Sequence, residues 1–162
     1  MPIIIDGYNL LHSIQKTSEE AGSITDFYLC QTLGRYFKLI GENAEIIFDG
    51  IGPPEKERLE NVSGLEVIFV GRNTDADTVI EDKIRSNTAP KMLTIVTNDR
   101  QIKDVGRLRR TSLVKCEKFW ADVQQNLSKK RAVKEPKGKR SGLSNAETEQ
   151  WLEIFGMDED AD

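Results

Sequence analysis

The chain has 162 residues, of which 38% are hydrophobic and 31% charged, and its formal net charge is −4. This composition is typical of a globular protein with a polar surface, and the length is sufficient for one domain with a hydrophobic core plus a short appendage. No apolar run approaches the roughly 20 residues of a membrane-spanning helix. The first apolar run meets Asp6 at once and has no basic segment before it, unlike a signal peptide. We therefore expect a cytoplasmic protein without a membrane partner.

In the first part of the chain, short apolar runs alternate with helical patterns. Residues 3–5 form a continuous apolar run, which is typical of a strand buried on both faces. A turn is predicted at residues 6–9, followed by a weak helical pattern. Residues 25–40 carry apolar side chains at helical spacing and end before a glycine, which predicts a helix. Residues 44–48 predict a second strand that leads into a loop rich in Gly and Pro.

The same alternation continues to residue 127. Three further strands are predicted at residues 65–70, 92–96 and 112–115. A helix is predicted at residues 75–86, with Thr74 as its N-cap. A second is predicted after residue 100 and up to residue 108, and a third at residues 116–127. Strands that alternate with helices predict an α/β domain whose mostly parallel sheet is covered on both faces.

The C-terminal part of the chain has a different composition. Residues 1–127 are predicted to form the folded domain. Residues 128–143 are rich in Lys, Gly, Ser and Pro, which favours a flexible basic linker. Residues 144–162 predict a short amphipathic helix and an acidic tail, with seven acidic residues and no basic one. The basic segment could attract a polyanion, but a solvated linker that happens to be rich in lysine fits it equally well.

The two cysteines, Cys30 and Cys116, are far apart and lack CxxC spacing. Free buried thiols in a reducing compartment are the favoured interpretation, and a disulfide is the alternative.

Acidic residues follow the predicted strands at several places. Asp6, Asp49 and Asp99 come after buried apolar strands, and Asp77 and Glu81 lie four residues apart on one predicted helix. Parallel sheets bind their ligands at the carboxyl ends of the strands. Carboxylates that gather at such an edge repel one another, and a divalent cation relieves the repulsion. Oxygen ligands favour Mg²⁺ or Mn²⁺, so the sequence predicts a site for one or two such ions.

Each of these acids also fits a purely structural role. Asp6 and Asp49 fit turns, Asp77 and Asp99 fit helix N-termini, and Glu81 fits a solvated helix face. The argument for a site depends on the joint pattern, because the predicted topology brings Asp6, Asp77 and Asp99 to one edge.

Other polar residues are candidates for contact with a nucleic acid. Asn9 could orient a metal ligand or a phosphate, or it could cap a helix. Basic residues that could contact phosphates are Arg100, Lys129, Lys130, Arg131 and Lys134.

Four segments together resemble a known family. They are Ile-Asp-Gly-Tyr-Asn at 5–9, Phe-Asp-Gly at 48–50, Ala-Asp-Thr-Val-Ile-Glu at 76–81 and Val-Thr-Asn-Asp-Arg at 96–100. In this order and spacing they resemble the NYN branch of the PIN-like nucleases, and its YacP-like bacterial group in particular. The resemblance covers residues 2–125, and the basic segment lies outside it.

The resemblance implies a three-layer α/β/α fold and an endoribonuclease that acts on single-stranded RNA with Mg²⁺ or Mn²⁺. The metal ligands that it implies are Asp6, Asp77 and Asp99, with Asn9 beside them, Glu81 as an additional ligand and Asp49 as a further one. YacP-like proteins include a ribosome-associated endonuclease that cleaves mRNA, so the ribosome is an expected partner. Asp75 departs from the pattern, because relatives tend to have an uncharged residue there.

The sequence therefore predicts a hydrolase that cleaves RNA with the help of a metal ion. The alternative is a non-catalytic RNA-binding or ribosome-binding module on the same fold. A sugar transferase with a DxD motif at residues 75–77 is a weaker alternative, because this motif opens a helix rather than a strand-end loop. No Gly-rich dinucleotide motif and no P-loop is present in the sequence.

Overall fold

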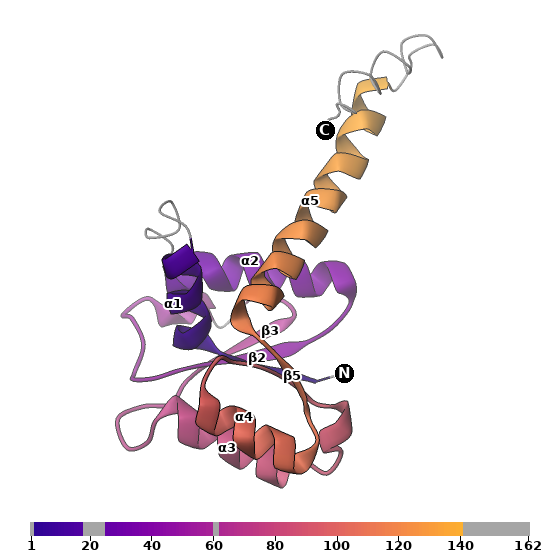
Figure 1. The fold of residues 1–162 in the computed structure, drawn as a ribbon. Coiled ribbons are helices and arrows are strands. Elements are labelled where there is room, and N and C mark those ends of the chain that lie inside the picture. Colours follow the sequence, from indigo (N-terminus) through magenta and orange to yellow (C-terminus); the bar gives the residue numbers. More distant parts are fainter. Residues whose placement is uncertain (1, 18–24, 60–61, 141–162) are drawn as a thin grey trace. The chain divides into compact units, whose positions relative to one another are not determined.

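The structure is a computed structural model, and it describes residues 2–17, 25–59 and 62–140. Its centre is a five-stranded sheet in the order β3-β2-β1-β4-β5, in which every neighbouring pair of strands is parallel (Figure 1). The strands are β1 (Ile3–Asp6), β2 (Ala44–Phe48), β3 (Leu65–Phe69), β4 (Thr94–Val96) and β5 (Ser112–Val114). The predicted α/β class with a parallel sheet is confirmed.

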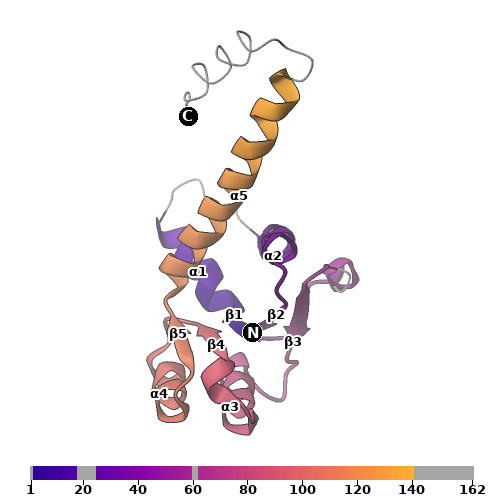
Figure 2. The ribbon, with the colours of Figure 1, turned by 90° about the vertical axis from the view of Figure 1, so that its right-hand side faces the viewer.

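Helices cover both faces of this sheet. They are α1 (Gly7–Thr17), α2 (Asp26–Ile40), α3 (Ala76–Ser86), α4 (Arg100–Arg109) and α5 (Cys116–Arg140), with short 3-10 turns η2 (Lys56–Leu59) and η3 (Pro90–Met92). Figure 2 shows α1 and α2 on one face and α3 and α4 on the other. The start of α5 packs on α2, where Phe119 contacts the rings of Tyr36 and Phe37. The three-layer α/β/α arrangement is therefore confirmed.

Strand alternation decides which side chains face α3 and α4. Ile4, Ile47 and Ile95 from the three central strands pack in one buried cluster with Ile80 and Ile84 of α3. Because side chains two apart on a strand share a face, the last residue of β1 points to the same layer as Ile4. The sheet thus directs the carboxylate at the end of β1 toward α3 and α4.

The connection after β1 differs from the prediction of a turn at residues 6–9. Helix α1 begins at Gly7, directly after the strand. A Cβ atom on Gly7 would lie 2.5 Å from the Phe48 ring, so only glycine allows the strand to enter the helix at this point. Tyr8 and Asn9 are therefore helical residues in the first turn.

Two helix boundaries also differ from their predictions. Asp75 rather than Thr74 caps α3, because its Oδ1 accepts a hydrogen bond of 2.7 Å from the Thr78 N–H. Helix α5 continues to Arg140, through much of the segment predicted as a linker. Residues 129–134 include Lys, Arg and Ala, which are good helix formers, and this favours the continuation of the helix past residue 127. The predicted helix within 144–162 lies outside the described residues.

The chain divides into two compact units, Met1–Val123 and Gln124–Asp162. The sheet, α1 to α4 and the first turns of α5 belong to the first unit. The second unit, in its described part, consists of the remainder of α5. The division into residues 1–127, 128–143 and 144–162, which was derived from composition, remains a prediction. Among the described residues, no helix has the length and apolar character needed to cross a membrane.

Candidate active site

The direction of the sheet order reverses between β1 and β4, which lie side by side. The chain builds outward from β1 to β2 and β3 on one side, and then returns to form β4 and β5 on the other. Such a reversal of direction is where parallel sheets bind ligands. Asp6 ends β1, and residues 97–99 follow β4 directly.

Asp6 is a buried carboxyl group at this point, with 5% of its surface exposed. Burial raises its pKa to about 7, and repulsion from Asp77 and Asp99 adds to the rise. A hydrogen bond of 3.0 Å from the Thr97 hydroxyl to Oδ2 acts in the opposite direction. The fold thus holds Asp6 in an environment that disfavours its negative charge.

Asp77 lies in the first turn of α3 and is half-buried. Burial raises the pKa of its carboxyl group, and repulsion from neighbouring acids raises it further. Those neighbours, in order of their effect, are Asp99, Asp75, Asp49 and Glu81. Repulsion from Asp99 is the largest of these effects, so the acid at the start of α4 disfavours the charge of the acid at the start of α3.

Asp99 caps α4 while it faces the other acids. Its Oδ1 accepts a hydrogen bond of 3.0 Å from the Ile102 N–H, so the capping role considered as an alternative is present. Its own N–H donates to the Thr97 hydroxyl oxygen at 3.0 Å. Thr97 therefore links Asp99 to Asp6, since the same hydroxyl donates to the Asp6 carboxylate. The structure brings Asp6, Asp77 and Asp99 together.

Asn9 holds the loop that carries Asp99. Its Oδ1 accepts hydrogen bonds from the Asn98 N–H at 2.7 Å and from the Cys116 thiol at 3.3 Å. Burial raises the pKa of Cys116 to about 12, so the thiol stays protonated and can donate. Asn98 in turn accepts from the Cys116 N–H at 2.9 Å and donates to Glu117. These contacts fasten α1, the loop after β4 and the start of α5 to one another.

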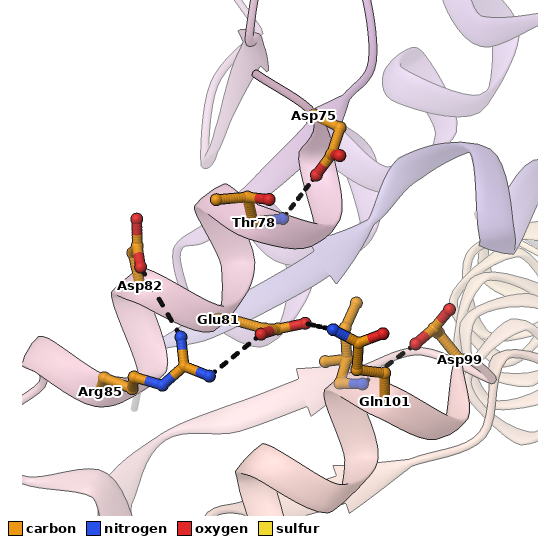
Figure 3. Close-up of polar contacts among 8 residues, drawn as sticks. Asp75, Thr78, Glu81, Asp82, Arg85, Asp99 and Gln101 are labelled. Carbon is orange, nitrogen blue, oxygen red and sulfur yellow. Dashed lines mark hydrogen bonds and ion pairs between the residues drawn. The ribbon is translucent and has the colours of Figure 1, made fainter.

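Glu81 lies one turn after Asp77 on α3 and is 6% exposed. Its Oε1 accepts from the Arg85 guanidinium at 3.1 Å, and its Oε2 accepts from the Gln101 amide at 3.0 Å. Figure 3 shows the Glu81 carboxylate between Arg85 on the same helix and Gln101 on α4, with Asp99 near the start of α4. Unlike Asp6, Asp77 and Asp99, Glu81 thus has a basic partner among the described residues.

The remaining acids at this edge lie farther out. Asp49 is exposed, and its Oδ1 accepts a hydrogen bond of 2.7 Å from the Ala76 N–H at the start of α3. Asp75 is exposed as well, and the hydrogen bond from Thr78 lowers its pKa. Both acids therefore stabilise the N-terminus of α3.

The predicted nucleic-acid contacts are described only in part. Arg100 is exposed, follows Asp99 directly and makes no ion pair within the described residues. Lys129 is exposed on α5. The side chains of Lys130, Arg131 and Lys134 lie outside the described part of the structure.

The donor set of this site consists of carboxylate oxygens, which are the ligands that Mg²⁺ and Mn²⁺ prefer. No basic side chain among the described residues forms an ion pair with Asp6, Asp77 or Asp99. Within residues 2–17, 25–59 and 62–140, however, no three acidic, histidine or cysteine side chains are already arranged as the ligands of one ion. The chemistry of the donors therefore fits a hard cation, while their arrangement is not that of a complete protein cage.

Comparison with known protein families gives a match to the model of the YacP-like NYN domain over residues 3–155. The chain belongs to the YacP-like NYN domain family. Among curated proteins, no sequence matches it significantly.

Solved structures similar to this YacP-like NYN domain include two of Rae1 (YacP) from Bacillus subtilis. The first is 21% identical in sequence, with a TM-score of 0.64, and the match covers 96% of this chain and 92% of that one. The second is its W164L mutant, which is 19% identical, with a TM-score of 0.61 and coverage of 99% and 98%. At these levels of sequence identity the structural similarity establishes the fold alone, and not the roles of individual residues.

Sequence reasoning missed three residues that support the site of this YacP-like NYN domain. Gln101 and Arg85 were not identified as partners of Glu81, and Glu117 was not identified as a partner of Asn98. The i, i+4 spacing of Glu81 and Arg85 is a signal that could have revealed one of these contacts. The bond from Gln101 to Glu81 joins two helices, and no spacing rule along the sequence predicts it.

Proposed function

We propose that this YacP-like NYN domain is a metal-dependent endoribonuclease that hydrolyses phosphodiester bonds of single-stranded RNA. The observation that carries the proposal is the group formed by Asp6, Asp77 and Asp99. One member of this group is buried, two have raised pKa values, and none has a basic partner among the described residues. Uncompensated carboxylates at a ligand-binding edge favour a cation as their physiological partner. Membership in the NYN family supports RNA as the substrate.

Asp6, Asp77 and Asp99 would hold Mg²⁺ or Mn²⁺. Mg²⁺ is commonly bound by one or two carboxylates, several waters and substrate phosphates rather than by a complete protein cage. An incomplete set of protein ligands therefore fits a metal whose coordination is completed by solvent and RNA. When bound, such an ion lowers the pKa of water and stabilises negative charge that develops on the phosphate.

The other residues of the site would orient these carboxylates. Thr97 fixes one oxygen of Asp6 and, through its contact with the Asp99 N–H, the position of the loop after β4. Asn9 holds the same loop through Asn98. Exposed Arg100 is placed to attract an RNA phosphate at the edge of the site. Because the nucleophile is water rather than the RNA 2′-hydroxyl, the products would carry a 5′-phosphate and a 3′-hydroxyl.

The proposal includes the cytoplasm as the place of action and mRNA on the ribosome as a natural substrate. It draws on the resemblance to YacP-like proteins and on the basic composition of residues 128–140, with seven basic residues and one acidic one. A basic segment of this kind attracts RNA without regard to sequence, and that attraction weakens as salt is added.

The direct test is cleavage of labelled single-stranded RNA by the purified full chain with Mg²⁺ or Mn²⁺, with and without EDTA. We expect internal cleavage that EDTA abolishes. The Asp77→Asn variant should lose cleavage by about 1,000-fold or more, because loss of a metal ligand removes several kcal/mol of transition-state stabilisation.

The matched control is Asp82→Asn, which makes the same chemical change on the same helix. Asp82 is exposed, and its carboxylate lies 3.7 Å from Arg85, away from the group formed by Asp6, Asp77 and Asp99. This control should cleave at the wild-type rate. RNA binding by the wild-type chain without cleavage under any of these conditions would reject the enzyme and favour the non-catalytic RNA-binding module.

A further inference from the structure

We propose that Glu81 is a positioning residue of this site rather than one of its metal ligands. This inference rests on the proposed metal-dependent function and specifies which acid of the edge would not bind the metal. It sets aside the role of additional ligand that the resemblance implied for Glu81. The juxtaposition that carries it is the buried contact of Glu81 with Arg85 and Gln101 (Figure 3).

Both oxygens of the Glu81 carboxylate already have partners. Its side chain is 8% exposed and accepts the Arg85 guanidinium on Oε1 and the Gln101 amide on Oε2. Burial of a carboxylate without a partner is costly, and Arg85 supplies the compensating positive charge. Glu81 therefore does not need a metal ion to offset its charge, unlike Asp6 and Asp77.

The position of Arg85 also opposes a metal ion next to Glu81. A guanidinium nitrogen lies 3.1 Å from Glu81 Oε1, and a divalent cation bound to the same carboxylate would be repelled by this fixed charge. The Arg85 side chain is 56% exposed, but the oxygen that it contacts belongs to a buried carboxylate. Solvent therefore screens the repulsion less than it would at an open surface.

The second partner of Glu81 aligns the two helices that carry Asp77 and Asp99. Glu81 lies four residues after Asp77 on α3, and Gln101 lies two residues after Asp99 at the start of α4. The bond of 3.0 Å between Glu81 and Gln101 thus ties α3 to α4 within one turn of both acids. Neighbouring groups that orient metal ligands in this way affect metal affinity without touching the metal.

The first test is titration of the full wild-type chain with Mn²⁺, in which calorimetry and the EPR signal of free Mn²⁺ measure binding. We expect binding, which supplies the reference affinity for the variants. No binding at all would reject the metal dependence of the proposed function itself, and the inference with it.

Variants separate a ligand from a positioning residue. Glu81→Gln keeps an oxygen and an amide that can bond to Gln101 but removes the charge, so its Mn²⁺ affinity should stay within about threefold of wild type. Gln101→Leu leaves every carboxylate in place but breaks the link between the helices, and should weaken Mn²⁺ binding by about 10-fold. Asp77→Asn should weaken it by more than either.

The order of these affinities decides the question. A loss in Glu81→Gln as large as that in Asp77→Asn would show that Glu81 is a ligand and would overturn the proposal. Unchanged affinity in Gln101→Leu would overturn its positioning role. Circular dichroism of each variant verifies folding.

Discussion

Acidic side chains at the two ends of the central sheet differ in whether a basic partner lies beside them. At the amino end, Glu45 of β2 forms an ion pair of 2.9 Å with Lys83 in the last turns of α3, and the Arg109 guanidinium donates to the Asn87 carbonyl at 2.6 Å. At the carboxyl end, Asp6 is buried without a basic partner in the described part of the chain, close to acids that repel it. Glu45 at the amino end thus has an opposite charge beside it, whereas Asp6 at the carboxyl end has none within the described residues.

This difference identifies the end of the sheet that stability alone does not explain. A buried carboxylate next to other acids lowers the stability of the folded state. Functional sites commonly retain such unfavourable groups, and replacing them stabilises the protein at the expense of activity. The comparison therefore predicts opposite responses to mutation at the two ends.

The largest expected effect is the loss of activity on neutralising the buried acid. Asp6→Asn keeps the size of the side chain and an oxygen that can accept the Thr97 hydroxyl, but it removes a charge that would bind the metal. Cleavage of single-stranded RNA with Mn²⁺ should fall by about 1,000-fold. Activity close to wild type, measured beside the Asp82→Asn control, would remove Asp6 from the proposed mechanism.

The same variant should be more stable than the wild type in the absence of metal. Because the pKa of Asp6 is raised from 3.8 to about 7, the folded chain retains a proton between these values that the unfolded chain releases. Stability should therefore fall as pH rises from about 4 to 7, and should change little from this source above pH 7. At pH 8 with EDTA, Asp6→Asn should increase the free energy of unfolding by about 2–4 kcal/mol.

Urea unfolding at pH 4 and at pH 8 checks both the sign and the pH range. At pH 4 the variant and the wild type should differ little, because this pH lies close to the pKa of Asp6 in the unfolded chain, which therefore gains little free energy by releasing the proton that the folded chain retains. A variant that is less stable than the wild type at pH 8 would contradict the environment described for Asp6.

A smaller loss of stability is expected from the contacts that hold the loop after β4. Asn98→Ala leaves the Cys116 N–H and Glu117 without their partner, which should lower the free energy of unfolding by about 1–3 kcal/mol. Asn73→Ala is the matched control, because Asn73 is exposed. Equal stability of these two variants would show that the loop is not held in this way.

The smallest effect is expected at the amino end of the sheet. Lys83→Met breaks the ion pair with Glu45, both of whose side chains are about one-third exposed. Partly exposed pairs contribute little, so the free energy of unfolding should fall by about 1 kcal/mol or less. The variant should cleave RNA as the wild type does, and a loss of cleavage would show that charge at this end also matters for function.

The sequence was sufficient to predict the strand-end acids because a parallel sheet imposes a simple rule. Apolar runs marked the strands, and alternation with helices made them parallel. Asp6 followed its run directly, and Asp99 followed its run after a step of two residues. The reversal of strand order between β1 and β4 then brings them to one place. The structure places these acids next to Asp77, while their roles as metal ligands remain predictions.

The parts that could not be predicted depend on contacts between distant side chains. The contact of Gln101 with Glu81 joins two helices, and that of Asn98 with Glu117 joins a loop to α5. Neither follows from periodicity or composition. Gly7 was predicted in a turn because glycine favours turns, but its approach to the Phe48 ring shows that its small size is what the fold requires.

The most direct test of the central claim is the effect of Mn²⁺ on thermal unfolding of the wild-type, Asp6→Asn and Asp77→Asn chains at pH 7.5. At a metal concentration about 100 times the dissociation constant, binding should raise the Tm of the wild type by about 5–10 °C. We predict no such rise in either variant. An equal rise in all three chains, or none in the wild type, would contradict the claim that the uncompensated carboxylates of this edge form a cation site.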